Sequence, residues 1–200
     1  MNIMIIVKHK INTLTNLKKI PKIYGVEVDV RLNNKKFILS HNNNYKINKT
    51  YLDNFIKKFK HKYLILNLKE QHLAKKLLKY MTQKKIENFF LLDLFPHEII
   101  KLKSKEKICT RFSYYENLKN LDKIKQFSKW VWVDFLNKKK ITKREFKNLK
   151  KLGYNVCIVS PEVAGYKSLK LIKNFILYLK KNKIYPEMVC TKKNKLWGSF

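Results

Sequence analysis

Short apolar runs alternate with lysine-rich amphipathic stretches along the whole chain, and this alternation constrains the fold more than any other feature. Runs of this length suit buried strands, whereas apolar side chains repeated every three or four residues are typical of helices. The predicted strands are Ile3–Lys8, Tyr24–Val30, Tyr63–Leu68, Phe89–Leu92, Ile108–Phe112, Val131–Asp134, Tyr154–Ser160 and Met188–Thr191. The predicted helices are Thr13–Ile20, Lys49–Lys60, Ala74–Lys84, His97–Lys103, Tyr115–Phe127, Thr142–Leu152 and Ser168–Lys181, and Lys36–Ser40 is an extra strand or extended loop.

Strands that alternate with helices imply parallel pairing through right-handed crossovers. We therefore predict an α/β fold, a single compact (β/α)8 TIM-like barrel over residues 1–200, close to the lower size limit of that fold. The short tail after Met188–Thr191 leaves a final helix open. A doubly wound open sheet is the alternative, but its nucleotide-binding form carries a glycine-rich turn after the first strand. Here that turn, Lys8–Asn12, contains no glycine.

The second predicted strand, Tyr24–Val30, carries two acids on one face. Successive side chains of a strand point to opposite faces, so Glu27 and Asp29 converge while the intervening valines share the other face. Two such carboxylates are the hard oxygen ligands that a divalent cation requires. The alternative is a half-exposed strand whose acids lie in water.

In barrels of this class the functional residues lie at the carboxyl ends of the strands. A random lysine-rich chain would place lysine there, whereas these ends carry acids, histidines, an amide and one of only three arginines. Taken one at a time they are weaker evidence, because Asp93 and Asp134 also suit the N-caps of the helices that follow. The candidate site residues are His9, Glu27, Asp29, His41, Asn67, Lys69, Asp93, Arg111, Asp134 and Glu162.

The net charge of +32 favours anionic partners, but only three of the 46 basic residues are arginine. The lysines are spread through every helix, and their excess beside Asn, Ile, Phe and Tyr is typical of A- and T-rich codons. No nucleic-acid-binding motif is present. We therefore expect a small anionic substrate and no dedicated nucleic-acid partner.

The cysteines and the chain start indicate the compartment. Cys109, Cys157 and Cys190 lie in apolar runs, as buried thiols in a reducing environment do. Residues 1–7 are too short for a signal-peptide core, and no run approaches the ~20 apolar residues of a membrane span. The expected location is the cytoplasm.

Three motifs in the first seventy residues resemble the glycerophosphodiester phosphodiesterases and the related phosphatidylinositol-specific phospholipases C. They are His9 after the first strand, Glu27-x-Asp29 ending the second, and His41 preceded by a short apolar strand. Beyond them the chain matches only by its barrel periodicity. Segments around Asp93, Arg111, Asp134 and Glu162 also resemble a phosphodiesterase-like group found among bacterial surface-polysaccharide genes.

The sequence departs from the family pattern at three places. Lys10-Ile11 follows His9 where the family has Arg-Gly, and Asn42 follows His41 where the family has Asp. Asn67 stands where the diesterases have a glutamate metal ligand. An amide oxygen can bind Mg²⁺ or Ca²⁺ without contributing charge, so the affinity should fall or another acid such as Asp134 must help.

The resemblance implies metal-dependent phosphodiester hydrolysis with His9 and His41 as the acid–base pair. It implies one divalent cation, Mg²⁺ or Ca²⁺ with Mn²⁺ as a further candidate, held by Glu27, Asp29 and Asn67. The nucleophile implied is a neighbouring hydroxyl of the substrate, which gives a cyclic phosphate that water opens. The expected phosphate- and substrate-binding residues are Lys69, Arg111, Asp93, Asp134 and Glu162.

Two other functions stay open. The charge and the missing third acid suit a non-catalytic barrel that binds phospholigands or nucleic acid. A different barrel enzyme, such as a metal-dependent aldolase or isomerase, would present a similar set of strand-end residues.

Overall fold

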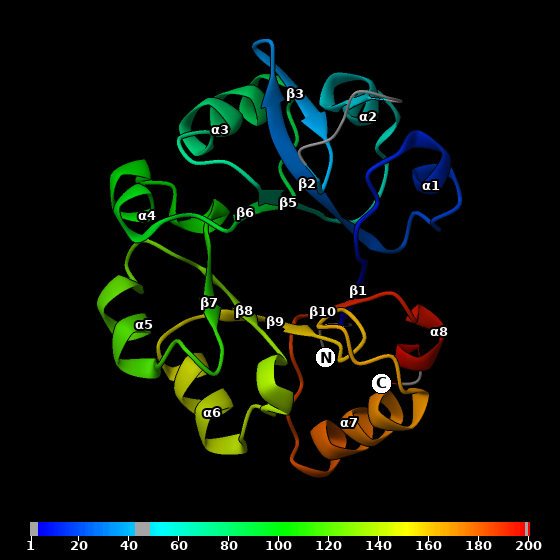
Figure 1. Ribbon diagram of the computed structural model, residues 1–200. Coiled ribbons are helices and arrows are strands. Elements are labelled where there is room, and N and C mark those ends of the chain that lie inside the picture. The colour runs from blue at the N-terminus through cyan, green and yellow to red at the C-terminus, as the bar shows by residue number, and fades with distance from the viewer. Residues whose placement is uncertain (1–3, 43–48, 199) are drawn as a thin grey trace.

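The computed structural model describes residues 4–42, 49–198 and 200, in which strands alternate with helices (Figure 1). Two short 3₁₀ turns, Lys105–Lys107 and Leu136–Lys138, lie in the connections. The strands are β1 (Ile5–Lys8), β2 (Gly25–Asn33), β3 (Lys36–Leu39), β4 (Thr50–Tyr51), β5 (Leu64–Leu68), β6 (Phe89–Leu92), β7 (Cys109–Phe112), β8 (Trp130–Val133), β9 (Asn155–Val159) and β10 (Met188–Thr191). The helices are α1 (Leu14–Lys18), α2 (Leu52–Lys58), α3 (Ala74–Gln83), α4 (Pro96–Leu102), α5 (Leu118–Ile124), α6 (Lys143–Lys151), α7 (Leu169–Lys181) and α8 (Asn194–Trp197).

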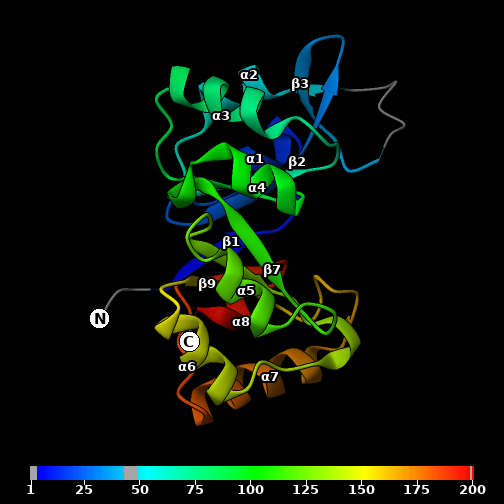
Figure 2. The same cartoon turned by 90° about the vertical axis from the view of Figure 1, so that its left-hand side faces the viewer.

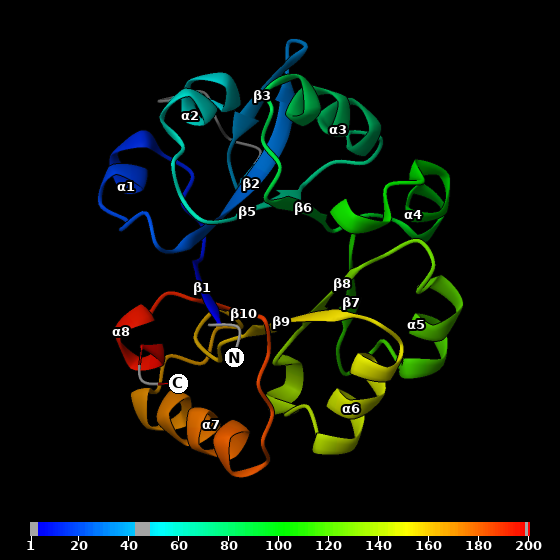
Figure 3. The same ribbon diagram turned by 180° about the vertical axis from the view of Figure 1, so that it is seen from behind.

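Parallel ladders connect the strands in the order β7, β8, β9, β10, β1, β2, β5, β6. The two ends of this order meet at a single parallel bridge, in which Leu91 of β6 pairs with Ile108 just before β7. The ring of strands therefore has one seam held by a bridge instead of a ladder. The helices lie outside the ring in the front and back views (Figure 1, Figure 3), whereas a doubly wound sheet carries helices on both faces. The predicted barrel is confirmed.

The end of the chain supplies the helix that the sequence left open. After β10, residues Asn194–Trp197 form the one-turn helix α8. It lies between α1 and α7 and completes the ring of helices (Figure 3). Trp197 of α8 is buried, and its indole N–H donates to Ser160 Oγ at 3.0 Å. The short tail is therefore part of the core.

Some boundaries differ from the prediction because tertiary contacts override local periodicity. The helix predicted from Lys49 begins at Leu52, because Thr50 and Tyr51 pair with β3 in an antiparallel ladder as β4. The helix predicted from Tyr115 begins after Asn117, whose side chain accepts the Asn120 N–H as an N-cap. Of the predicted first strand, Ile3 lies outside the described residues.

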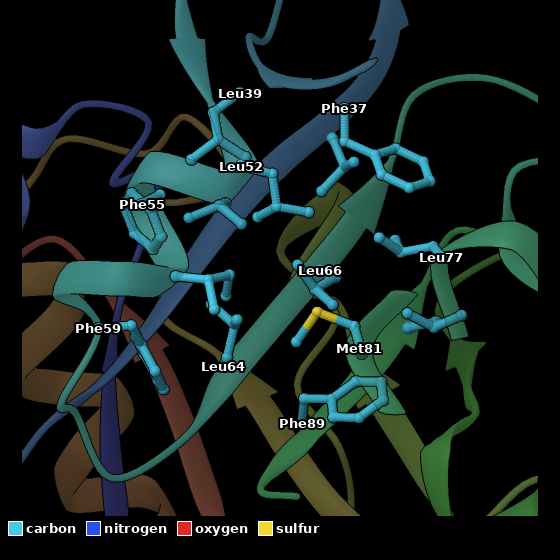
Figure 4. Packing of buried hydrophobic residues seen from close by; sticks show 14 of the residues in the cluster. Phe37, Leu39, Leu52, Phe55, Phe59, Leu64, Leu66, Leu77, Met81 and Phe89 are labelled. Carbon is cyan, nitrogen blue, oxygen red and sulfur yellow. The ribbon is translucent and has the colours of Figure 1, made fainter. Parts of the chain in front are cut away.

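The core has an inner and an outer layer, as alternation along the strands requires. In β5, Ile65 packs inside the barrel with Phe90 and Trp130, whereas Leu64 and Leu66 pack outward against the helices (Figure 4). Cys109, Cys157 and Cys190 are buried free thiols, as predicted from their apolar surroundings. All three lie in the inner layer.

Strand β2 is longer than its neighbours and sets the geometry of one side of the mouth. Its first residues pair with β1, and its last four pair with β3 as a hairpin that projects beyond the ring (Figure 2). The valines of β2 join the outer layer, so Glu27 and Asp29 face the interior and are buried. Over the described residues, no helix has the length and apolar character needed to cross a bilayer.

A methyl group at Gly25 should disturb the packing of β2 between its neighbours. A Cβ there would lie 3.0 Å from Val7 Cγ2 and 3.1 Å from the Tyr63 carbonyl oxygen. We expect Gly25→Ala to lower the free energy of unfolding by about 1–3 kcal/mol in urea denaturation followed by tryptophan fluorescence. Gly198→Ala is the control, because its nearest Cβ contact is 3.7 Å. Equal stability of the two variants would contradict the prediction.

Candidate active site

Glu27 and Asp29 lie between the carboxyl ends of β1 and β5. The parallel register places Val26 beside Lys8 of β1 and Asp29 beside Asn67 of β5. Glu27 is completely buried and Asp29 nearly so. Each strand end therefore delivers side chains to the same pair of acids.

His9 follows β1 and contacts the first acid. Its Nε2 lies 3.8 Å from Glu27 Oε2, and the N–H of Lys10 donates to the same oxygen at 2.7 Å. Lys10 has a positive φ of 59°, a conformation that non-glycine residues seldom adopt. Burial, and next the charge of Lys192, lower the pKa of His9 to about 4, so the imidazole is neutral near pH 7.

Asn67 completes the surroundings of Glu27. Its Nδ2 donates to Glu27 Oε1 at 3.1 Å, while its Oδ1 is buried with no hydrogen-bond partner among the described atoms. Burial raises the pKa of Glu27 to about 7, and the charge of Asp29 adds to the rise. Asn67 Oδ1 therefore lacks a donor, and the hydrogen bonds from Lys10 and Asn67 do not offset the cost of burying the charge of Glu27.

Asp29 is better compensated. Burial alone would raise its pKa, but a hydrogen bond from Asn12 Nδ2 at 2.8 Å and the Lys69 ammonium 3.1 Å away outweigh it, and the pKa is lowered. Asn12 also accepts the backbone N–H of Asp29 at 2.9 Å. His41 Nδ1 lies 3.3 Å from Asp29 Oδ2.

His41 reaches Asp29 through the hairpin. Leu39 of β3 pairs with Val30, and the Ser40 N–H donates to the Asp29 carbonyl at 3.0 Å. Arg31 Nη2 donates to the His41 carbonyl at 3.0 Å and so holds the residue at the mouth. The side chain of His41 is 49% exposed, against 18% for His9. One histidine therefore faces solvent and the other lies inside.

The remaining strand ends form a chain of alternating charge. Lys69 Nζ lies 3.7 Å from Asp93 Oδ2, and Arg111 Nε donates to Asp93 Oδ1 at 2.7 Å. Arg111 also pairs with Asp134, which accepts the Trp132 indole N–H at 2.9 Å. Burial raises the pKa of Asp134 despite the opposing charge of Arg111. The Arg111 fork thus contacts two carboxylates, and its binding of phosphate stays a prediction.

Glu162 lies apart from this chain of charges. Its carboxylate accepts hydrogen bonds from the Ser160 hydroxyl, the Thr191 hydroxyl and the Lys192 N–H, the last at 2.9 Å. These contacts join the ends of β9 and β10. A role in substrate binding stays a prediction for this residue.

The donor set fits one hard cation. Within the described residues, no three or more His, Cys, Asp or Glu side chains are grouped to hold a metal. Two buried carboxylates and the Asn67 side chain nevertheless lie on adjacent strands, and the Asn67 Oδ1 is buried without a hydrogen-bond partner among the described atoms. A cation bound there stays a prediction. Oxygen ligands of this kind suit Mg²⁺, Ca²⁺ or Mn²⁺.

Sequence reasoning missed two residues that position the site. Asn12 bonds both the side chain and the backbone of Asp29, and Arg31 holds the His41 carbonyl. The one available signal for Arg31 was its rarity in a chain that otherwise uses lysine. Nothing in the pattern around Asn12 distinguishes it from the many other asparagines.

Comparison with known proteins places the fold. No protein-family model and no curated protein sequence matches the chain. A glycerophosphodiester phosphodiesterase from Agrobacterium tumefaciens has a TM-score of 0.70 at 10% identity, over 99% of this chain and 100% of that one. A glycerophosphoryl diester phosphodiesterase from Parabacteroides distasonis has a TM-score of 0.67 at 14% identity, over 96% of this chain and 83% of that one. These TM-scores show a shared fold at low sequence identity, which supports the resemblance.

The raised pKa of Glu27 predicts that this residue contributes a loss of stability to the metal-free protein as the pH rises, opposite in sign to the contribution of His9, whose pKa is lowered. Between the unfolded pKa of about 4.3 and the folded value of about 7, the folded state keeps a proton that the unfolded state releases. We expect Glu27→Gln to remove this loss. Relative to wild type, the free energy of unfolding of the variant should rise by roughly 2–3 kcal/mol from pH 5 to pH 8.

The measurement is urea unfolding in EDTA at several pH values. Glu145→Gln is the control, because hydrogen bonds and charge from Thr142 and Lys139 outweigh burial and lower the pKa of Glu145. That variant should keep the wild-type slope above pH 5. Parallel slopes for wild type and Glu27→Gln would refute the prediction.

Proposed function

We propose that this chain is a metal-dependent phosphodiester hydrolase of the glycerophosphodiester type. The observation that carries the proposal is the pairing of two histidines with two buried acids at one barrel mouth. His9 lies 3.8 Å from Glu27, and His41 lies 3.3 Å from Asp29. The shared fold with two named diesterases supports the same conclusion. Action in bacterial surface-polysaccharide metabolism and a cytoplasmic location stay predictions from the sequence.

Glu27, Asp29 and Asn67 are the residues that would hold the cation. When bound, it supplies positive charge against the phosphate anion, which otherwise repels a nucleophile. The ammonium of Lys69, which lies 3.1 Å from Asp29 Oδ1, would bind a phosphate oxygen. Arg111, Asp93, Asp134 and Glu162 complete the proposed substrate site.

The two histidines carry the protons. One imidazole accepts the proton of the attacking hydroxyl while the oxygen bonds to phosphorus. The other imidazole donates a proton to the leaving alkoxide as its bond to phosphorus breaks. Water or a neighbouring hydroxyl of the substrate can be the attacking group, and in the second case water opens the resulting cyclic phosphate.

Removal of His41 should abolish turnover. We expect His41→Ala to lower the metal-dependent hydrolysis of bis(p-nitrophenyl) phosphate by roughly 10²–10⁴-fold, the usual contribution of a positioned acid or base. His61→Gln is the control, because His61 contacts the Ile20 carbonyl outside the mouth. If wild type shows no turnover with Mg²⁺, Mn²⁺ or Ca²⁺ but binds DNA in a salt-sensitive way, the binding barrel replaces this proposal.

A third carboxylate at position 67 should strengthen the cation site. We expect Mn²⁺ or Ca²⁺ to raise the Tm of wild type by several degrees at saturation, because a ligand of the folded state stabilises it. Asn67→Asp should bind the ion roughly tenfold more tightly, since it adds charge to the donor set.

Thermal unfolding against metal concentration measures the effect without relying on activity. Asn16→Asp, an exposed change on α1, is the control and should leave the affinity unchanged. No metal-dependent shift in either wild type or Asn67→Asp would argue against a cation at this mouth.

A further inference from the structure

A second concave site lies outside the barrel mouth. A cavity of about 710 Å³ is formed by the tip of the β2–β3 hairpin, the start of α2 and one face of α3. These three elements lie together at one side of the ring (Figure 1). None of the candidate active-site residues lines this cavity. The hairpin separates the two sites, because Arg31 contacts His41 on one face while Phe37 packs on Tyr80 of α3 on the other.

Four lysines from two separate elements line the cavity: Lys35 and Lys36 of the hairpin, and Lys76 and Lys79 of α3. Across the parts of the chain that the structure describes, none of the four forms an ion pair with a carboxylate. Like charges held at one concave surface repel each other, and an anion would relieve that repulsion.

The one acid of the lining does not neutralise these lysines. Asp53 pairs with Lys57 at 2.8 Å and with Lys84, and it accepts the Tyr80 hydroxyl at 3.3 Å. Hydrogen bonds from Lys57 and Lys84 lower the pKa of Asp53 to about 2, so it stays ionised and occupied by these partners. The cavity therefore keeps an excess of positive charge.

Two of the lysines lie over aromatic rings. The Lys36 ammonium lies 5.8 Å from the ring centre of Tyr51, and that of Lys76 lies 5.8 Å from the ring centre of Phe37. Phe37 in turn packs edge-on against Tyr80 with ring centres 5.5 Å apart. Such contacts reduce the freedom of the long side chains, so less entropy is lost when an anion binds.

We propose that this cavity binds a small anion with two or more phosphate groups. Its volume is in the range of small-molecule pockets, and lysine ammoniums are point charges that suit phosphate oxygens. Charges spread over two elements fit several phosphates better than one. A nucleic-acid strand is the less suitable occupant, because lysines already lie over the rings on which bases would stack.

Calorimetric titration with inorganic tripolyphosphate at about 150 mM salt, where long-range charge effects are screened, tests the proposal. We expect wild type to bind and Lys36→Gln/Lys76→Gln to bind at least tenfold more weakly. The control Lys170→Gln/Lys173→Gln removes the same charge from exposed positions on α7, on the other side of the ring (Figure 1), and should bind within twofold of wild type.

Three results would overturn the proposal. The first is no binding by wild type at millimolar tripolyphosphate, and the second is an equal loss of affinity in both double variants. The third is binding of an oligothymidylate that tripolyphosphate does not displace. Unchanged Tm values show that the variants fold, and Lys79→Glu gives a second loss of binding independent of the rings. Hydrolysis of bis(p-nitrophenyl) phosphate should be the same in all these variants, so failure here is distinguishable from failure of the proposed activity.

Discussion

Two carboxylates buried on one face of β2 set the constraint on which the rest of the mouth depends. Glu27 and Asp29 have almost no contact with water, and burying charge costs several kcal/mol unless donors or cations replace the lost hydration. The loop after β1 supplies the Lys10 N–H and the Asn12 side chain. Strand β5 supplies Asn67, and Lys69 follows the end of that strand. The compensation is uneven: the pKa of Asp29 is lowered whereas that of Glu27 is raised. The cation proposed above would offset that inequality by compensating the charge of Glu27.

The barrel extends the same principle around its mouth. Successive strands present Asp29, Lys69, Asp93, Arg111 and Asp134, so each acid has a cation on the neighbouring strand. Adjacent parallel strands bring their carboxyl ends to one edge, which makes such an alternating row possible. The charges of this row already pair with one another. A substrate phosphate that bound there would replace some of the ion pairs between side chains with contacts to its own oxygens. At that side of the row the side chain of His41 is half-exposed, and Arg31 donates to its backbone carbonyl.

Much of the fold could be predicted because it rests on local periodicity. Alternating apolar residues set the faces of β2, and Thr142 with Glu145 forms a capping box at the start of α6, where a helix is predicted to begin. The parts that could not be predicted depend on partners far away in sequence. Tyr51 leaves the expected helix because Ile38 pairs with it, and Asn12 matters because the barrel brings Asp29 next to it. The positive φ of Lys10 likewise has no signal in residue type, because lysine seldom adopts this conformation.

The large net charge and the chemistry of the mouth are separate properties of this chain. At the mouth, Lys69 and Arg111 contact acids, so little of the surplus of +32 is expressed there. The surplus lies on the outer helices, where the field of a charge falls off over a Debye length of about 8 Å at physiological salt. Outside the cavity lined by Lys35, Lys36, Lys76 and Lys79, it can raise the local concentration of anions and speed their encounter, but it cannot select among them. Selection requires groups fixed in relative position, and the mouth has these in its buried acids and the two histidines beside them.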